Sequence, residues 1–191
     1  KVQSLYPDWQ YDHPRVLYAL IRLLKPEKVI ECGTFMGYGA CYMARALEEN
    51  VRGHLYCIDN WRVPNPEWRK EPVKVTVENS LRALDLWHRV LLIEGDSAEV
   101  EWPRADFIYI DAHHSYAACL KDWHKAVATG ATCICFDDAL GTIGPRRVVD
   151  EVVMPDPHWE VARIPGGAGL AICMKTTVTD HAPCPDTQEV E

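Results

Sequence analysis

Residues 29–39, VIECGTFMGYG, limit what this chain can fold into more than any other stretch. The apolar, β-branched start of the stretch predicts a buried strand that ends at Glu31. Gly33 and Gly37 follow in a tight turn, where the missing Cβ lets the backbone approach a ligand closely. Residues 40–47 then predict a helix whose N-terminal N–H groups point back at the turn. This pattern is typical of a nucleotide-type pocket.

The spacing of the turn also restricts the ligand. G-x-x-x-G is neither the G-x-G-x-x-G of dinucleotide-binding turns nor the G-x-x-x-x-G-K-[ST] of phosphate loops, and no Lys follows it. Glu31 would repel a pyrophosphate, whereas it would pair well with an ammonium group. We therefore expect a nucleoside that carries an amino acid rather than phosphates. Because strand, glycine turn and helix recur in many α/β proteins, the stretch alone does not decide the function.

The rest of the chain alternates between predicted strands and helices. Besides the strand at 28–32, strands are expected at residues 54–58, 90–94, 106–110 and 131–136, and helices at 14–24, 73–86, 116–129 and 144–154. Residues 159–164 and 168–175 flank a Pro-Gly-Gly turn and predict a hairpin at the sheet edge. We interpret the order as a β-α unit repeated five times, one more helix and the hairpin. This alternation predicts an α/β fold, a parallel sheet with helices on both faces.

One domain is expected over residues 1–175, because a chain of 191 residues, 48% of them hydrophobic, can bury a single sizeable core. Residues 1–27 should form an N-terminal flap and helix. The Pro- and Trp-rich residues 60–72 predict a lid loop, with a plain surface excursion as the alternative. Trp9, Trp61 and Trp68 could cover a substrate or simply pack the lid on the body. Residues 176–191 lack apolar periodicity and are expected to be disordered.

The composition and charge of the chain disfavour several kinds of partner. The net charge of -8 disfavours a nucleic-acid backbone, which needs clustered Lys and Arg. No stretch has the apolar length of a membrane span, and Lys1 begins no signal-peptide pattern, so we expect a cytoplasmic protein without a membrane partner. None of the eight cysteines forms C-x-x-C, which favours reduced, buried thiols over zinc ligands or disulfides. The N-terminal helix and the lid loop could also be contacts of a homodimer.

Acidic residues follow the predicted strands at the point where each strand ends. Because ligands of a parallel sheet bind at the carboxyl ends of its strands, six carboxylates are expected on one rim: Glu31, Asp59, Asp96, Asp111, Asp137 and Asp138. A charged residue directly after a buried strand usually has a partner. Asp59 closes the neighbouring strand, where the ribose diol of a nucleoside would be bound.

The acids after the fourth and fifth strands predict a metal site. Asp111 and the Asp137-Asp138 pair close adjacent strands, and hard oxygen ligands suit Mg²⁺, Mn²⁺ or Ca²⁺ rather than zinc. The alternative is that they cap turns and helices, as Asp111 could, but capping does not explain two consecutive acids. His114 lies three residues after Asp111, within reach of a metal-bound hydroxyl. Its ordinary pKa of about 6.5 suits a general base.

From about residue 14 to 175 the chain resembles the class I S-adenosylmethionine (SAM) methyltransferases, whose seven-stranded sheet has a reversed last strand. E-x-G-x-x-x-G-Y, ending at Tyr38, is similar to the first cofactor motif of the catechol-type O-methyltransferases. I-D-A-H-H-S-Y followed by Asp122 and F-D-D is still more similar to the metal-dependent sugar O-methyltransferases. Where that family has a second acid this chain has His113, so either His113 or His114 could be the base.

The resemblance implies a role for each matching residue. Glu31 and the turn of Gly33, Thr34, Gly37 and Tyr38 would hold the methionine part of SAM, Asp59 the ribose hydroxyls, and Asp96 with Ser97 the adenine edge. Asp111, Asp137 and Asp138 would bind Mg²⁺, and His114 matches the position of the catalytic lysine of the catechol-type enzymes.

We therefore expect a SAM-dependent, divalent-metal-assisted O-methyltransferase acting on a hydroxyl of a small sugar, polyol or phenol, with His114 or Asp111 taking the proton. Three alternatives remain at this point. The fold could serve a hydroxylase-like or other non-methylating enzyme, since fold does not fix chemistry. It could be a SAM-binding module without catalysis. Nucleic-acid methylation is disfavoured by the acidic charge and by the lack of an N-P-P-[YF] motif.

Overall fold

The computed structural model describes residues 12–62 and 71–176. The helices are α1 (Asp12–Leu24), α2 (Tyr38–Glu49), α3 (Val73–Ala83), α4 (Tyr116–Ala128) and α5 (Ile143–Val148), with a 3-10 helix η3 (Trp87–Arg89) and a π-helical turn η4 (Val149–Val153). The strands are β1 (Lys28–Cys32), β2 (His54–Asp59), β3 (Val90–Glu94), β4 (Phe107–Ile110), β5 (Cys133–Phe136), β6 (Trp159–Ile164) and β7 (Leu170–Lys175).

All seven strands belong to one sheet with the order β3-β2-β1-β4-β5-β7-β6. β7 runs antiparallel to both of its neighbours, whereas the pairs among β1 to β5 are parallel. The expected mostly parallel sheet with a reversed last strand is therefore confirmed, and the hairpin of β6 and β7 lies at the edge as predicted. The last strand along the chain, β7, lies between β5 and β6 in the sheet.

One part of the predicted order is wrong. The β-α unit was expected five times, but residues 95–106, between β3 and β4, form no helix. β3 is an edge strand, and β4 pairs with the far side of β1, so this segment must carry the chain across β2 and β1. The segment ends at Asp106, whose carboxylate accepts the N–H groups of Glu27 and Lys28 and so ties the start of β1 to β4.

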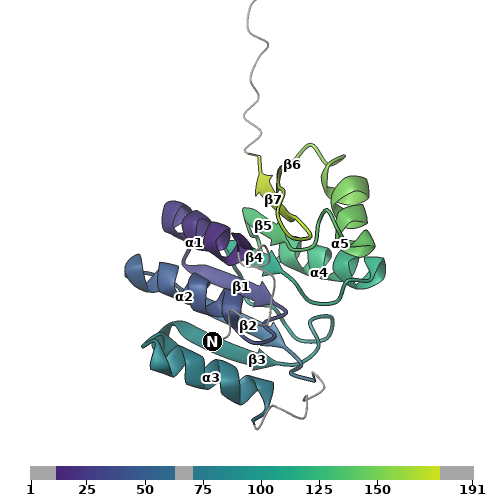
Figure 1. Cartoon of the computed structure of the whole chain (residues 1–191). Helices are drawn as coiled ribbons and strands as arrows, with labels where there is room; N and C mark the ends of the chain where they lie inside the picture. The colour runs from purple at the N-terminus through teal and green to yellow at the C-terminus, as the bar shows by residue number, and fades with distance from the viewer. Residues whose placement is uncertain (1–11, 63–70, 177–191) are drawn as a thin grey trace, which may run out of the picture.

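Helices cover both faces of the sheet and form three layers with it (Figure 1). α1, α2 and α3 pack on one face around Leu17, Met43 and Leu47, and α4, α5 and η4 pack on the other around Trp123 and Val149. Successive strand residues alternate between the two clusters, as the pleat of a sheet covered on both faces requires.

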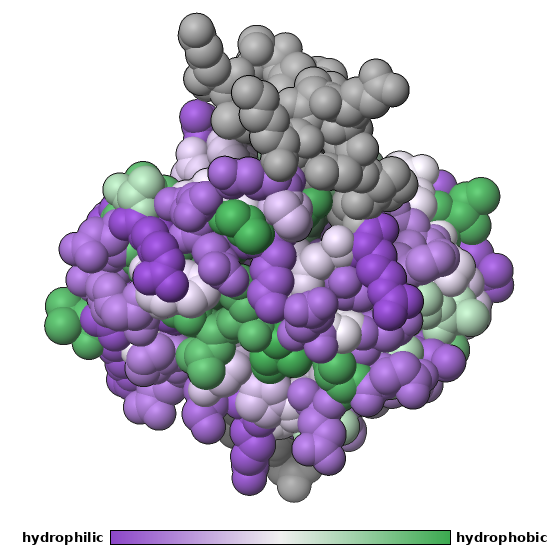
Figure 2. Space-filling model, turned by 90° about the horizontal axis from the view of Figure 1, so that it is seen from below, coloured by the Kyte–Doolittle hydropathy of each residue, from purple (hydrophilic) through white to green (hydrophobic). Residues whose placement is uncertain are grey.

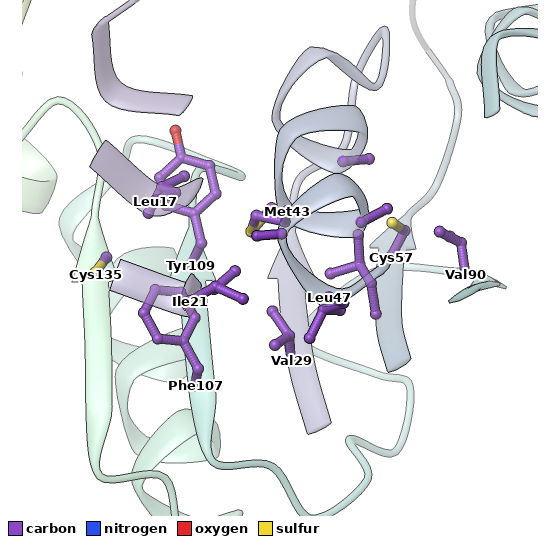
Figure 3. Packing of buried hydrophobic residues seen from close by; sticks show 14 of the residues in the cluster. Leu17, Ile21, Val29, Met43, Leu47, Cys57, Val90, Phe107, Tyr109 and Cys135 are labelled. Carbon is purple, nitrogen blue, oxygen red and sulfur yellow. The ribbon is translucent and has the colours of Figure 1, made fainter. Parts of the chain in front are cut away.

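The cluster on the side of α1, α2 and α3 includes one residue with a polar hydroxyl, Tyr109. Figure 3 shows Tyr109 of β4 rising beside Leu17 and Ile21, with its hydroxyl directed away from Phe107. Tyr109 is 4% exposed. A buried phenol hydroxyl needs a hydrogen-bond partner, and here it finds one at the carboxyl end of the sheet.

Polar and charged side chains cover most of the face seen in Figure 2, on the side of α3 and β3, with apolar residues in a smaller group across its middle. Within residues 12–62 and 71–176 no helix combines the length and apolar character needed to cross a membrane. Cys32, Cys41, Cys57, Cys119, Cys133, Cys135 and Cys173 are free thiols.

Some expectations fall outside the described residues: the flap before α1, Trp9, Trp68, most of the lid loop and the C-terminal tail. Trp61 is described. It is partly buried against the core cluster of α1 and α2, which is the packing role rather than the substrate-covering one. Its backbone takes the left-handed conformation at φ 54°, and its N–H donates to Asp59 Oδ1 at 2.7 Å.

Candidate active site

A cavity of about 430 Å³ opens at the carboxyl ends of β1, β2, β3 and β4. Its walls come from four loops, and its lining residues are Gly33, Phe35, Ile58, Asp59, Asn60, Gly95, Asp96, Ser97, Asp111, Ala112, His113 and His114. Gly33, Asp59, Asp96, Ser97, Asp111, His113 and His114 were named from the sequence, and the structure brings them to one place. The size is within the range of small-molecule sites.

The glycine turn is held against the loop after β4. Gly33 has φ 90°, and a Cβ at this position would lie 2.1 Å from the carbonyl oxygen of Asp111. The N–H of Gly33 donates to the carbonyl of Ile58 at 2.9 Å. Only glycine allows this approach, so Gly33 joins the nucleotide-type turn to the acidic end of β4.

Asp59 organises the same turn through its carboxylate. Oδ2 accepts the backbone N–H groups of Thr34 at 2.9 Å and Phe35 at 2.8 Å, and Oδ1 accepts that of Trp61. Phe35 has φ 47°, an uncommon conformation for a residue with a side chain. Each carboxylate oxygen can accept more than one hydrogen bond, so Asp59 can hold the turn and still receive ligand hydroxyls.

Four predicted cofactor residues do not line the cavity: Glu31, Thr34, Gly37 and Tyr38. Glu31 is 1% exposed and lies beneath α2, where a Cβ on Gly39 would come within 2.4 Å of its Oε1. Burial raises the pKa of Glu31 to about 8, while Cys57, whose Sγ lies 3.4 Å from Oε2, opposes that rise. Glu31 therefore supports the turn from below in this conformation.

The other three residues belong to the turn and to the start of α2. Thr34 is buried. Gly37 precedes the first helical residue with φ 76°. Tyr38 is 37% exposed and stacks edge-on with Tyr42 at a centroid distance of 5.2 Å.

The loop after β3 is fixed from α4. Lys125 Nζ donates to the carbonyls of Ser97 at 2.8 Å and Val100 at 2.7 Å. Asp96 Oδ1 accepts the N–H of Ala98 at 2.9 Å. Asp122, one turn before Lys125, is 1% exposed, and its oxygens have no hydrogen-bond partner within 3.5 Å in the described part of the chain. Burial raises the pKa of Asp122, and the nearby Ser97 side chain opposes that rise.

His114 lies between two of the predicted metal ligands. Its Nε2 is 3.5 Å from Asp111 Oδ1 and its Nδ1 is 3.1 Å from Asp138 Oδ2. Burial and then repulsion from Asp137 raise the pKa of Asp111 to about 7, partly offset by the bond to His114. The same bond raises the pKa of His114. The pKa values of Asp111 and His114 are both raised and the two groups face each other at 3.5 Å, an arrangement that suits proton transfer.

His113 differs from His114 in one chemical respect. Its Nδ1 accepts the backbone N–H of Ser115 at 3.1 Å, so the lone pair on that nitrogen is already used. The neutral ring then carries its proton on Nε2, which can only donate. Of the two candidates, His114 is the one whose surroundings suit a base.

The structure adds two residues that sequence reasoning missed, His13 and Tyr109. His13 Nδ1 lies 2.6 Å from Asp137 Oδ1, and the Tyr109 hydroxyl donates to Asp137 Oδ2 at 2.8 Å. His13 is separated from Asp137 by 124 positions, and no motif connects them. The only signal for Tyr109 is its polar tip within an otherwise apolar strand, F-I-Y-I.

The three predicted metal ligands lie at one end of the sheet but are engaged with protein groups. Asp137 bonds to His13 and Tyr109, and Asp138, at φ 56°, faces His114. Across residues 12–62 and 71–176, no three His, Cys, Asp or Glu side chains are grouped in a way that could hold a metal ion.

Comparisons with known proteins agree with this geometry. A methyltransferase domain family matches residues 30–139, the span from within β1 to just beyond β5. The tapetum-specific methyltransferase 1 of Arabidopsis thaliana is 27% identical over 188 residues, covering 86% of this chain and 76% of that protein.

Solved structures share the fold. The O-methyltransferase TomG of Streptomyces achromogenes, involved in tomaymycin synthesis and solved with SAM, has a TM-score of 0.68 at 19% identity, covering 86% of this chain and 80% of its own. An O-methyltransferase of Bacillus cereus solved with SAH (the demethylated form of SAM) has a TM-score of 0.67 at 18% identity, covering 86% and 81%. Since the family match spans more than half of the chain, this protein belongs to the methyltransferase domain family.

Proposed function

We propose that this protein transfers the methyl group of SAM to a hydroxyl group of a small molecule such as a sugar, polyol or phenol. One observation carries the proposal: the glycine turn with Asp59, and the Asp111–His114 pair, line the same cavity. One part suits a nucleoside that bears an amino acid, and the other suits removal of a proton. The SAM and SAH held by O-methyltransferases of this fold support the choice of cofactor.

The reaction needs one proton acceptor. As the acceptor oxygen forms its bond to the methyl carbon, the carbon–sulfur bond of the sulfonium breaks and SAH leaves. The hydroxyl proton passes to the Asp111–His114 pair. Alignment of oxygen, carbon and sulfur in the cavity supplies much of the acceleration, because it converts an encounter of two molecules into a step within one complex.

The proposed site roles follow from position. The turn of Gly33 and Phe35, shaped by Asp59, binds the nucleoside, and Asp59 receives the ribose hydroxyls. Asp96 and Ser97 form the opposite wall, which the adenine edge would contact. Glu31, Thr34, Gly37 and Tyr38 act behind this surface, where they set the shape of the turn.

The expected divalent cation does not fit the residues as they are arranged. The His13 ring lies 2.6 Å from Asp137 Oδ1, which also accepts the N–H of Asp138, and His114 lies between Asp111 and Asp138. A cation held by the three carboxylates would compete with both histidines for these oxygens. We therefore derive no step through a metal, and we expect methyl transfer to continue in the presence of EDTA.

Methyl-labelled SAM tests the proposal. Incubated with a panel of sugars, polyols and phenols, the protein should place label on at least one acceptor. His114→Gln should lower the rate by about 10²–10⁴-fold, the usual contribution of a general base. His124→Gln, on the exposed face of α4, is the matched control and should keep the wild-type rate.

Two other results would replace the proposal. SAH binding without any methyl transfer would indicate a cofactor-binding module without catalysis. Conversion of a hydroxylated substrate without transfer of label would indicate a non-methylating enzyme on this fold.

A further inference from the structure

His13 is a buried histidine with a hydrogen-bond acceptor at each ring nitrogen. It lies in the first turn of α1 and is 4% exposed. Its Nδ1 is 2.6 Å from Asp137 Oδ1, and its Nε2 is 2.9 Å from the carbonyl oxygen of Gly166. The ring therefore joins α1 to the end of β5 and to the turn between β6 and β7.

These contacts fix the protonation of the ring. A carbonyl oxygen only accepts, so Nε2 carries a proton and donates it to Gly166. Nδ1 faces a carboxylate oxygen, which also accepts, so Nδ1 carries a proton as well. A ring with both protons is an imidazolium, and His13 and Asp137 form a buried ion pair.

The ion pair reduces the capacity of Asp137 to accept another cation. Oδ1 also accepts the N–H of Asp138 at 2.9 Å, and Oδ2 accepts the hydroxyl of Tyr109 at 2.8 Å. The same hydroxyl lies 3.3 Å from Asp111 Oδ2, so the pair is continuous with the cavity wall. A chain of hydrogen bonds thus joins His13 to Asp111 through the side chains of Asp137 and Tyr109.

His114 lies on the open side with looser contacts than His13: its Nε2 is 3.5 Å from the nearest carboxylate oxygen and its side chain is 41% exposed, so its nitrogens are not both fixed as donors. It has a carboxylate oxygen at each ring nitrogen, from Asp111 and Asp138. Three carboxylates therefore meet two imidazole rings, one buried and one lining the cavity. A magnesium site would place one dipositive ion among the same oxygens.

We propose that His13 is a positioning residue that supplies Asp137 with the positive charge a divalent cation would otherwise bring, so that the cluster of Asp111, Asp137 and Asp138 holds its geometry without a metal. The charge is covalently part of α1, so it is present at every metal concentration. This inference concerns the site of the proposed methyl transfer but does not depend on that reaction.

Titration of the full chain with Mn²⁺, followed by electron paramagnetic resonance of the free ion, tests the inference. Two variants separate the contacts of His13. His13→Asn can keep a hydrogen bond to Asp137 but removes the charge, whereas His13→Gln can keep the bond to Gly166 and frees Asp137. Both should bind Mn²⁺ at least about tenfold more tightly than the wild type. His158→Asn, an exposed histidine 3.9 Å from Asp156, is the matched control and should not.

The binding of SAH separates loss of folding from the predicted effect, since a folded variant still binds it. Mn²⁺ binding by the wild type that Asp137→Asn abolishes would overturn the inference. So would a folded His13→Asn that binds Mn²⁺ no better than the wild type. Failure of SAH to bind the wild type, in contrast, would overturn the proposed function and leave the Mn²⁺ result to be read on its own.

A measurement on the wild type alone decides the case if the variants do not fold. Heteronuclear NMR at neutral pH should show a proton on both ring nitrogens of His13. A single protonated nitrogen would mean that the ring is neutral and would overturn the inference.

Discussion

Single residues decide whether the cavity exists, and Gly33 is the clearest example. Its backbone has φ 90°, and its Cα lies against the carbonyl of Asp111. Asp59 then fixes the next two residues through their N–H groups. The turn is thus determined by one missing side chain and one carboxylate, each of which can be changed separately.

Gly33→Ala should destabilise the fold by more than the about 1–3 kcal/mol that a strained backbone conformation costs, because the new Cβ would also meet the Asp111 carbonyl at 2.1 Å. Gly130→Ala is the matched control, since Gly130 has φ 91° but its Cβ would have no heavy atom closer than 3.7 Å. Urea denaturation measures both. Equal losses in the two variants would show that the contact with Asp111 does not matter.

Glu31 makes the stability of the fold depend on pH. Its pKa is about 8 in the fold against an ordinary value of 4.5, so between these values the unfolded chain ionises Glu31 while the folded chain keeps the proton. The free energy of unfolding should therefore fall as pH rises through this window.

Glu31→Gln, which stays neutral, should remove on the order of a few kcal/mol of that fall between about pH 4.5 and about pH 8. Urea denaturation across this range measures the effect. Asp111 also ionises in this window, but it is present in both proteins and cancels from the difference. Glu101→Gln, at an exposed position, should follow the wild type. Parallel curves for wild type and Glu31→Gln would refute the prediction.

At the scale of elements, each wall of the cavity is a loop tied to a helix or strand. The loop after β3 depends on α4, because Lys125 donates to two of its carbonyls. The loop after β4 leads into α4 through Ser115, whose hydroxyl accepts the N–H of Ala118 at 3.3 Å as a helix cap. α4 therefore supports both the Ser97 wall and the His114 wall.

Lys125→Met keeps the aliphatic stem but removes both donated hydrogen bonds. The unpaired carbonyls should cost about 1–3 kcal/mol of stability, and the looser Ser97 wall should weaken SAH binding. Lys121→Met, exposed on the same helix, should stay within about 0.5 kcal/mol of the wild type. Denaturation and calorimetry on both variants make the comparison. An unchanged SAH affinity in Lys125→Met would show that α4 does not shape the binding wall.

At the scale of the whole molecule, the sequence predicted the sheet and the residues at its carboxyl ends. Apolar runs followed by acids placed Asp59, Asp111 and Asp137 correctly, because a strand pattern is local and ends where its burial ends. The path of residues 95–106 across β2 and β1 could not be predicted, since strand order depends on pairing across the sheet.

The contacts inside the site could not be predicted for the same reason. His13 reaches Asp137 only after α1 has packed beside β4 and β5, a relation that no spacing along the chain encodes. Glu31 was expected in the cavity, but the close approach of α2 at Gly39 covers it. The position of each residue at the end of a predicted strand showed which residues meet at the carboxyl edge of the sheet. Packing of the helices decided which of them face the cavity.

The most direct test of the whole account is a calorimetric titration of the wild-type protein with SAH. We expect saturable binding of one SAH per chain, weakened by Asp59→Asn because that change loosens the glycine turn and removes the charge that receives the ribose hydroxyls. No saturable binding by the folded wild type would contradict the account.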